Sequence, residues 1–171
     1  LIGHPTPCYY YDVSLLDATL KEVHKHGIDK GYHVHFALKA NHEPYILKKI
    51  QEAGLGADCV SGGEIQQALD NGFSPDQIAF AGVGKSDQEI TLGLKSDIFC
   101  FNVESLQELN VINEIAKKRQ TKAPVALRLN PNIPFKTNMY ITTGLNDNKF
   151  CISDEELHLV IEALQKLSYI E

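Results

Sequence analysis

The sequence lacks the features that mark membrane, nucleic-acid-binding and secreted proteins. Its apolar runs are too short to span a bilayer. A formal net charge of -6, with no basic patch, argues against a nucleic-acid partner. The first seven residues contain two prolines and no apolar core, which is unlike a secretory signal. We therefore expect a cytoplasmic protein with neither a membrane nor a nucleic-acid partner.

Closely spaced cysteine pairs are also missing. Cys8, Cys59, Cys100 and Cys151 are far apart and include no Cys-x-x-Cys. Two disulfides are possible from the even count. However, Cys59 and Cys100 lie within or at the ends of strand-like runs, where a free cysteine behaves as a small buried hydrophobe. A cytoplasmic compartment favours reduced thiols.

The signature loops of several enzyme classes are absent as well. There is no Gly-x-Ser-x-Gly elbow, no Walker loop and no Gly-x-Gly-x-x-Gly. Two histidine pairs, His24-x-His26 and His33-x-His35, could each offer two metal ligands. The first pair is in a helical pattern, where residues two apart do not face each other, and the second has no obvious third ligand at zinc-like spacing. We therefore expect structural histidines and no metal.

What remains is the profile of a globular domain. The 171 residues are 43% hydrophobic and 22% charged, which is typical of soluble proteins and sufficient for a sizeable core. Apolar strand-like runs alternate with helical patterns, which indicates βα units and a parallel sheet. The expected strands cover 33–38, 56–60, 77–81, 98–102 and 124–130, and the expected helices lie near 14–27, 43–53, 62–71, 87–95, 104–119 and 154–167.

Three helix starts carry a capping-box pattern, in which a serine is followed three residues later by a glutamate. They begin at Ser61, Ser86 and Ser153. Between Asn130 and Ser153 the sequence predicts a long loop, and loops of that length are usually functional or mobile.

Two architectures fit five βα units. A closed (β/α)8 barrel typically needs about 250 residues, whereas a flavodoxin-like open sheet fits the length directly. The open sheet is simpler on pattern alone, although Lys39-Ala40-Asn41-His42-Glu43-Pro44 after the first strand is not a glycine-rich phosphate loop. Because the chain does not start with methionine, we expect it to be a piece of a longer protein.

Lys39 is a candidate catalytic residue. Strand side chains alternate, so His35, Ala37 and Lys39 share one face, and apolar Phe36 and Leu38 share the face expected to pack on helices. Lys39 would then lie on the inner face at the carboxyl end, where α/β folds bind ligands. Burial there favours the neutral amine that attacks an aldehyde. A solvated lysine beyond a strand end is the alternative.

Two further charged residues lie in strand-like runs. Asp58 in the second run would be costly in a barrel interior unless it were paired, so it either faces cationic chemistry or lies near the rim. Arg128 in the last run needs an anion or acceptors, and its fork suits a carboxylate or a phosphate. A structural ion pair is the alternative for Arg128.

A series of ordered motifs runs along the chain: Thr6-Pro7-Cys8-Tyr9-Tyr10-Tyr11-Asp12, Phe36-Ala37-Leu38-Lys39-Ala40-Asn41, Gly56-Ala57-Asp58-Cys59-Val60-Ser61-Gly62-Gly63-Glu64, Phe80-Ala81-Gly82-Val83-Gly84-Lys85, Phe101-Asn102-Val103-Glu104-Ser105, Arg128-Leu129-Asn130-Pro131, Ile141-Thr142-Thr143-Gly144 and Asn148-Lys149-Phe150. In this order they resemble the amino-terminal part of the diaminopimelate decarboxylases, within the fold-type III decarboxylases that depend on pyridoxal 5′-phosphate (PLP). One departure is Cys151, where the family usually has glycine after Lys-Phe.

The resemblance implies a fold, a cofactor and a reaction. Residues 1–171 would form about five βα units of an incomplete PLP-binding (β/α)8 barrel domain, without the remaining strands and the carboxy-terminal β domain. Lys39 would carry PLP as a Schiff base, with Asp58 and Arg128 near the cofactor. The full-length protein would be a homodimeric lyase that converts meso-diaminopimelate to L-lysine and carbon dioxide, and the 171 residues alone would be inactive. An ornithine- or arginine-type decarboxylase and a non-catalytic PLP-binding homologue remain alternatives.

Overall fold

Five parallel strands form one sheet whose order in space follows their order in the chain. A computed structural model describes residues 3, 5–130 and 151–171. Its strands are β1 His35–Ala37, β2 Gly56–Cys59, β3 Ile78–Phe80, β4 Cys100–Val103 and β5 Val125–Leu127, in the order β1-β2-β3-β4-β5. All five predicted strands are confirmed, each shorter than predicted.

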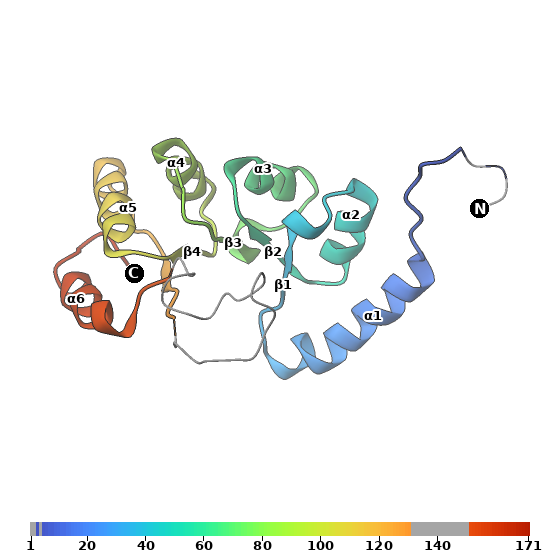
Figure 1. Ribbon diagram of the computed structural model, residues 1–171, viewed down its shortest axis with the longest axis horizontal. Helices are drawn as coiled ribbons and strands as arrows, with labels where there is room; N and C mark the ends of the chain where they lie inside the picture. Colours follow the sequence, from blue (N-terminus) through green and yellow to red (C-terminus); the bar gives the residue numbers. More distant parts are fainter. Residues whose placement is uncertain (1–2, 4, 131–150) are drawn as a thin grey trace.

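Helices connect successive strands. They are α1 Val13–His26, α2 Pro44–Glu52, α3 Gly62–Asp70, α4 Asp87–Ser96, α5 Leu106–Arg119 and α6 Asp154–Leu164, with short 3₁₀ turns η1 Ile28–Lys30, η2 Leu38–Ala40 and η3 Pro75–Gln77. Figure 1 shows α2, α3, α4 and α5 side by side along one side of the strands. None of the helices in the described ranges is long and apolar enough to cross a membrane.

The strand order decides between the two architectures. A flavodoxin-like sheet has the order 2-1-3-4-5, with its first strand inside the sheet. Here β1 and β5 are the outermost of the five strands, and each parallel connection leads to the adjacent strand. Right-handed crossovers in a constant direction place their helices on one face of the sheet, as in a barrel. The partial-barrel prediction is confirmed, and the open doubly wound sheet is wrong.

The two faces of the sheet differ in polarity because side chains alternate along each strand. The helix-facing side is a set of buried apolar residues in register: Ala57, Cys59, Ile78, Phe80, Phe101 and Val103. The residues of opposite parity form the inner face, and they include His35, Ala37, Asp58, Ala79, Cys100 and Asn102. The inner face therefore carries the polar groups of the strands.

Helix capping confirms two of the three predicted capping boxes. Ser86 and Ser153 each exchange hydrogen bonds with the glutamate three residues later. At Ser61 only one half forms: its hydroxyl accepts from the N–H of Glu64, while the Glu64 carboxylate accepts from Val60 N–H at 2.7 Å. The predicted reciprocal capping box at Ser61 is therefore wrong, because Glu64 accepts from the N–H of the residue before the serine.

The chain extends the sheet beyond β5. Ala123 pairs with Ile170 in a parallel bridge, and Leu129 pairs with Ile152. These isolated bridges lie beside β5, at the edge of the five-stranded sheet. The long loop predicted after Asn130 falls mostly on residues 131–150, outside the described ranges.

Gly93 is where α4 packs directly on β4. A Cβ built there would lie 2.7 Å from the ring of fully buried Phe101 and 3.0 Å from Ile98. We expect Gly93→Ala to lower the free energy of unfolding by about 1–3 kcal/mol, the usual cost of overpacking. Urea unfolding of the full-length protein containing this chain measures it.

Gly84→Ala is the matched control, because a Cβ at Gly84 meets nothing within 4 Å. That change should leave stability unaltered or raise it by up to about 1 kcal/mol. If Gly93→Ala were as stable as the control, the packing of α4 on β4 would be wrong.

Candidate functional site

The loops that follow the carboxyl ends of the strands hold most of the candidate residues. In barrels this edge binds ligands, because the loops after parallel strands converge there. Lys39 follows β1, Ser61 follows β2, Gly82 and Lys85 follow β3, and Glu104 follows β4. Arg128 follows β5 directly, with its N–H donating to the carbonyl of Val103 at 2.8 Å.

Lys39 lies in the 3₁₀ turn η2, two residues beyond the end of β1. The buried side chain of Leu38 anchors this turn in the core, while Lys39 is exposed. The expectation that Lys39 is buried is therefore wrong, because the strand ends at Ala37 and Lys39 lies in the exposed turn that follows it. Among the described residues it has no hydrogen-bond or ion-pair partner, so its amine is accessible.

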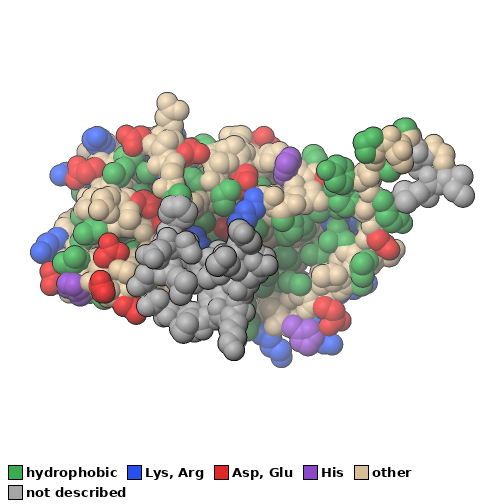
Figure 2. Space-filling model, in the orientation of Figure 1, with side chains coloured by type: hydrophobic (Ala, Val, Ile, Leu, Met, Phe, Trp, Pro, Cys, Tyr) green, Lys and Arg blue, Asp and Glu red, His purple; other side chains and the backbone are tan. Residues whose placement is uncertain are grey.

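A hollow of about 640 Å³ opens beside Lys39. Its walls come from the turn after β1, the start of α2 and the amino-terminal arm, which contributes Tyr9 and Tyr11. Figure 2 shows hydrophobic side chains gathered along this arm, at the right of the view. The volume lies within the usual range of small-molecule sites. The amine of Lys39 is thus at the wall of a space that could hold a cofactor.

Asp58 lies on the inner face of β2, in register between Ala37 and Ala79. It is half-buried, and it contributes to the pKa shifts of two inner-face neighbours. Burial lowers the pKa of His35, and Asp58 opposes that shift. Burial raises the pKa of the Cys100 thiol, and Asp58 adds to it. Asp58 is therefore an interior carboxylate of the sheet, below the loops that hold Lys39.

The interior thiols are not candidate nucleophiles. All four cysteines are free, and Cys59 and Cys100 are buried, as predicted. Burial raises the pKa of Cys59 to about 12, with smaller contributions from Glu64 and Asp58. A thiol so poorly ionised at neutral pH is chemically inert. The chemistry at this edge rests on the lysine and the charged residues.

Arg128 forms an ion pair with Glu104. Its Nη1 donates to Glu104 Oε1 at 2.9 Å. The carboxylate is 3% exposed, and the arginine side chain is 53% exposed. The predicted need of Arg128 for an acceptor is thus met by a carboxylate of the chain. Because half of the side chain is accessible, it can still meet an external anion.

A buried lysine in the loop after β3 binds groups of β4 and α5. Lys85 is 1% exposed, and its Nζ donates to the carbonyls of Gly82 and Asn102, at 2.7 and 2.8 Å, and to Glu108 Oε1. It also lies 5.3 Å from the ring centre of Phe80. These contacts tie the β3–α4 loop to β4 and to the first turn of α5.

Glu104 and Lys85 lie within motifs visible in the sequence, Phe101-Asn102-Val103-Glu104-Ser105 and Gly82-Val83-Gly84-Lys85, yet neither is a candidate residue there. Their sequence signal is weak, because a charged residue just past a strand looks the same whether it is solvated or buried.

The candidate residues do not form one contact cluster. β1 and β5 are separated by four strand spacings, roughly 19 Å along the sheet at about 4.8 Å per strand, so Lys39 and Arg128 lie at opposite ends of the array. They share the carboxyl edge, and Asp58 lies on the inner face between them. A ligand that touched all three would occupy the concave side of the sheet.

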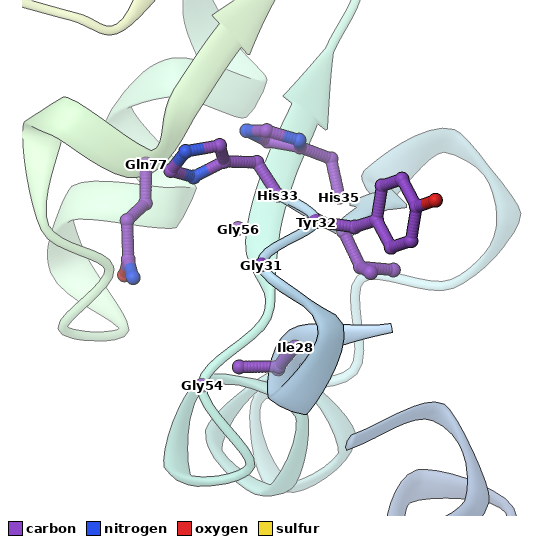
Figure 3. Close-up of a pocket in the computed structure, with 9 residues that line it drawn as sticks. Ile28, Gly31, Tyr32, His33, His35, Gly54, Gly56 and Gln77 are labelled. Carbon is purple, nitrogen blue, oxygen red and sulfur yellow. The ribbon is translucent and has the colours of Figure 1, made fainter. Parts of the chain in front are cut away.

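A second hollow, of about 440 Å³, lies at the opposite, amino-terminal ends of the strands. Figure 3 shows the rings of His33 and His35 side by side there, close to Gly56 and Gln77. Both rings also lie against Phe99, with centres 5.6 and 5.5 Å apart. No group of three possible metal ligands occurs in the described part of the chain. This end of a barrel ordinarily serves stability.

Comparison with known proteins gives concordant results. The family described as pyridoxal-dependent decarboxylase, pyridoxal binding domain, matches residues 15–170. Diaminopimelate decarboxylase of Bacteroides thetaiotaomicron is 48% identical over 97% of this chain and 43% of its own length. The crystal structure of the Helicobacter pylori diaminopimelate decarboxylase complexed with L-lysine superposes with a TM-score of 0.89 at 40% identity, covering 99% of this chain and 43% of that one.

A more distant structure shares the fold alone. The arginine decarboxylase of the Paramecium bursaria Chlorella virus has a TM-score of 0.73 at 22% identity, over 90% of this chain and 39% of its own. This chain spans less than half the length of each of these relatives. Because the family match covers nearly all of its residues, the chain belongs to the pyridoxal-dependent decarboxylases and corresponds to their pyridoxal-binding domain.

Proposed function

We propose that these 171 residues form the first five βα units of the PLP-binding barrel of a diaminopimelate decarboxylase. The full-length protein would remove one carboxylate of meso-diaminopimelate as carbon dioxide and leave L-lysine. The observation that carries the proposal is the accessible amine of Lys39 at the carboxyl edge of a barrel-type sheet, in a chain 48% identical to a diaminopimelate decarboxylase.

The residues present fit PLP. An aldehyde cofactor needs an amine that is accessible and not held in an ion pair, and Lys39 has no such partner among the described residues. The hollow beside it is large enough for a small cofactor. When bound, PLP accepts the electrons left behind as the substrate's carboxylate departs. Lys39 holds the cofactor through Nζ, and the anchored turn Leu38–Ala40 fixes where that amine lies.

Asp58 and Arg128 are the other two proposed cofactor residues. The exposed part of the Arg128 guanidinium offers N–H donors to an anionic group, for which its planar fork is suited. Asp58 places a negative charge on the inner face, below Lys39, where it can orient cationic groups of the cofactor or the substrate. Both roles rest on the family resemblance of their motifs.

The substrate is proposed from similarity. The relatives at 40–48% identity reported above are diaminopimelate decarboxylases, while the arginine decarboxylase at 22% supports only the fold. Retention of Lys39 favours a catalytic protein over a non-catalytic PLP-binding homologue. Family resemblance further supports a cytoplasmic homodimer involved in lysine biosynthesis.

Replacing Lys39 should remove covalent PLP. We expect the full-length protein containing this chain to absorb at the long wavelength of protein-bound PLP, and Lys39→Ala to lose that band, because no other amine lies in the same position. Absorption spectra recorded with added PLP measure this.

Lys48→Ala is the matched control, since Lys48 is an exposed lysine of α2 that pairs only loosely with Glu52, at 4.0 Å. It should keep the band. An unchanged spectrum in Lys39→Ala would overturn the assignment of the cofactor lysine.

Substrate preference provides a separate test. We expect the full-length protein to release carbon dioxide from meso-diaminopimelate with a kcat/KM at least about 100-fold above that for ornithine or arginine, the scale of discrimination that a site built for a second polar group achieves. Carbon dioxide release with each amino acid measures it. Faster turnover of ornithine or arginine would replace the diaminopimelate assignment and leave the PLP site intact.

A further inference from the structure

Glu104 is a buried carboxylate at the carboxyl end of β4 whose two oxygens differ. Oε1 accepts hydrogen bonds from Gly82 N–H at 3.2 Å and from Arg128 Nη1 at 2.9 Å. Oε2 is buried and has no donor among the described residues. Burying a carboxylate is costly unless its oxygens are satisfied. A buried carboxylate oxygen without a donor calls for an explanation, and a functional role is one of those to consider.

Glu104 is held in place by groups other than Arg128. The Glu104 N–H donates to Glu108 Oε2 at 2.8 Å, and the other oxygen of Glu108 binds Lys85. Lys85 in turn donates to the carbonyl of Gly82, whose N–H binds Glu104. Gly82 has φ of +116° and lies against the carbonyl of Val60, so the loop needs glycine at this point. Glu104 is fixed by backbone and buried groups, not by Arg128.

Arg128 is the exposed member of the pair. Its side chain is 53% exposed, and an exposed arginine loses much rotamer freedom when it is fixed. Glu104 engages Nη1, and a guanidinium has five N–H donors. One end is thus pinned by a rigid acceptor, and the other donors remain available at the carboxyl edge.

We propose that Glu104 is a positioning residue that fixes the guanidinium of Arg128 in the orientation that binds the cofactor. This inference rests on the proposed function, in which Arg128 contacts PLP. Glu104 does not touch the cofactor itself. Its negative charge and its fixed position hold the guanidinium in one orientation before PLP binds. Arg128 then loses less conformational freedom when PLP binds.

If the Glu104–Arg128 pair only stabilised the fold, a different result would follow. Breaking the pair would lower the free energy of unfolding, but it would leave PLP affinity unchanged at temperatures where the protein is folded. A positioning role couples the two residues in PLP binding. A double-mutant cycle on the PLP dissociation constant separates the two roles.

The experiment uses the full-length protein containing this chain and its variants Glu104→Gln, Arg128→Gln and the double variant. Gln keeps the size of Glu and an acceptor for Gly82 N–H, so the fold is disturbed as little as possible. Apoprotein is titrated with PLP below the thermal unfolding transition of every variant, and the absorption spectrum of the bound cofactor is recorded. We expect Glu104→Gln to weaken PLP binding roughly tenfold, the scale of one charge-assisted hydrogen bond, and to shift the spectrum.

Coupling is the decisive readout. The double variant should bind PLP as Arg128→Gln does, because Glu104 has nothing left to position. Asp17→Asn is the matched control: it breaks an ion pair of similar length, Lys49 to Asp17 at 3.0 Å, on the outer helices α1 and α2. It should change PLP affinity less than twofold.

The outcomes are distinguishable. Additive effects of Glu104→Gln and Arg128→Gln, or an affinity in Glu104→Gln equal to wild type, would overturn the positioning role and leave the proposed function standing. A wild-type protein that does not bind PLP would overturn both.

Discussion

The structure depends on the alternation of side chains along parallel strands that pair in sequential order. Every strand directs one set of residues to the helices and the other set to the interior. The helix-facing set is apolar, and its central members, typified by Ala57, Phe80 and Phe101, are fully buried, so it holds the layers together. The opposite set is then free to carry Asp58 and Asn102. A one-residue slip of register would exchange the two and place charges among the helices.

At the carboxyl edge, buried contacts of Lys85 and Leu38 position the candidate functional residues. The loop after β3 is tied to β4 and α5 by Lys85, whose side chain is almost inaccessible and is paired with Glu108 and two backbone carbonyls. A buried charge of this kind is tolerated only when its partners are fixed. The loops are therefore rigid supports for Glu104 and, through it, for Arg128. On the β1 side, Leu38 does the same for Lys39 by anchoring the turn.

Local patterns were sufficient for the elements but not for their assembly. Apolar periodicity predicts each strand, and serine–glutamate spacing predicts where α4 and α6 begin, because both signals act within a few residues. Strand order is a long-range property, so the pattern of five βα units alone favoured an open sheet. The barrel-type arrangement follows only from the observed strand order, in which β1 lies at one end and pairs with β2. Only the family resemblance favoured the barrel from the sequence.

The candidate site shows the same limit. Lys39, Asp58 and Arg128 could be chosen from the sequence, since each is an ionisable residue in an apolar context. The exposure of Lys39 could not be predicted from the sequence, because it depends on where β1 ends and the 3₁₀ turn begins. Glu104 could not be recognised as the partner of Arg128, because they are 24 residues apart and meet only when β4 and β5 pair.

The central claim is that Lys39 is the amine that binds PLP, and reductive trapping tests it most directly. The full-length protein would be incubated with PLP, reduced with borohydride and digested, and the peptides analysed by mass spectrometry. The account predicts a stable phosphopyridoxyl group on the peptide that contains Lys39. A label on Lys85, Lys48 or Lys49 in its place, or no label on any lysine, would contradict it.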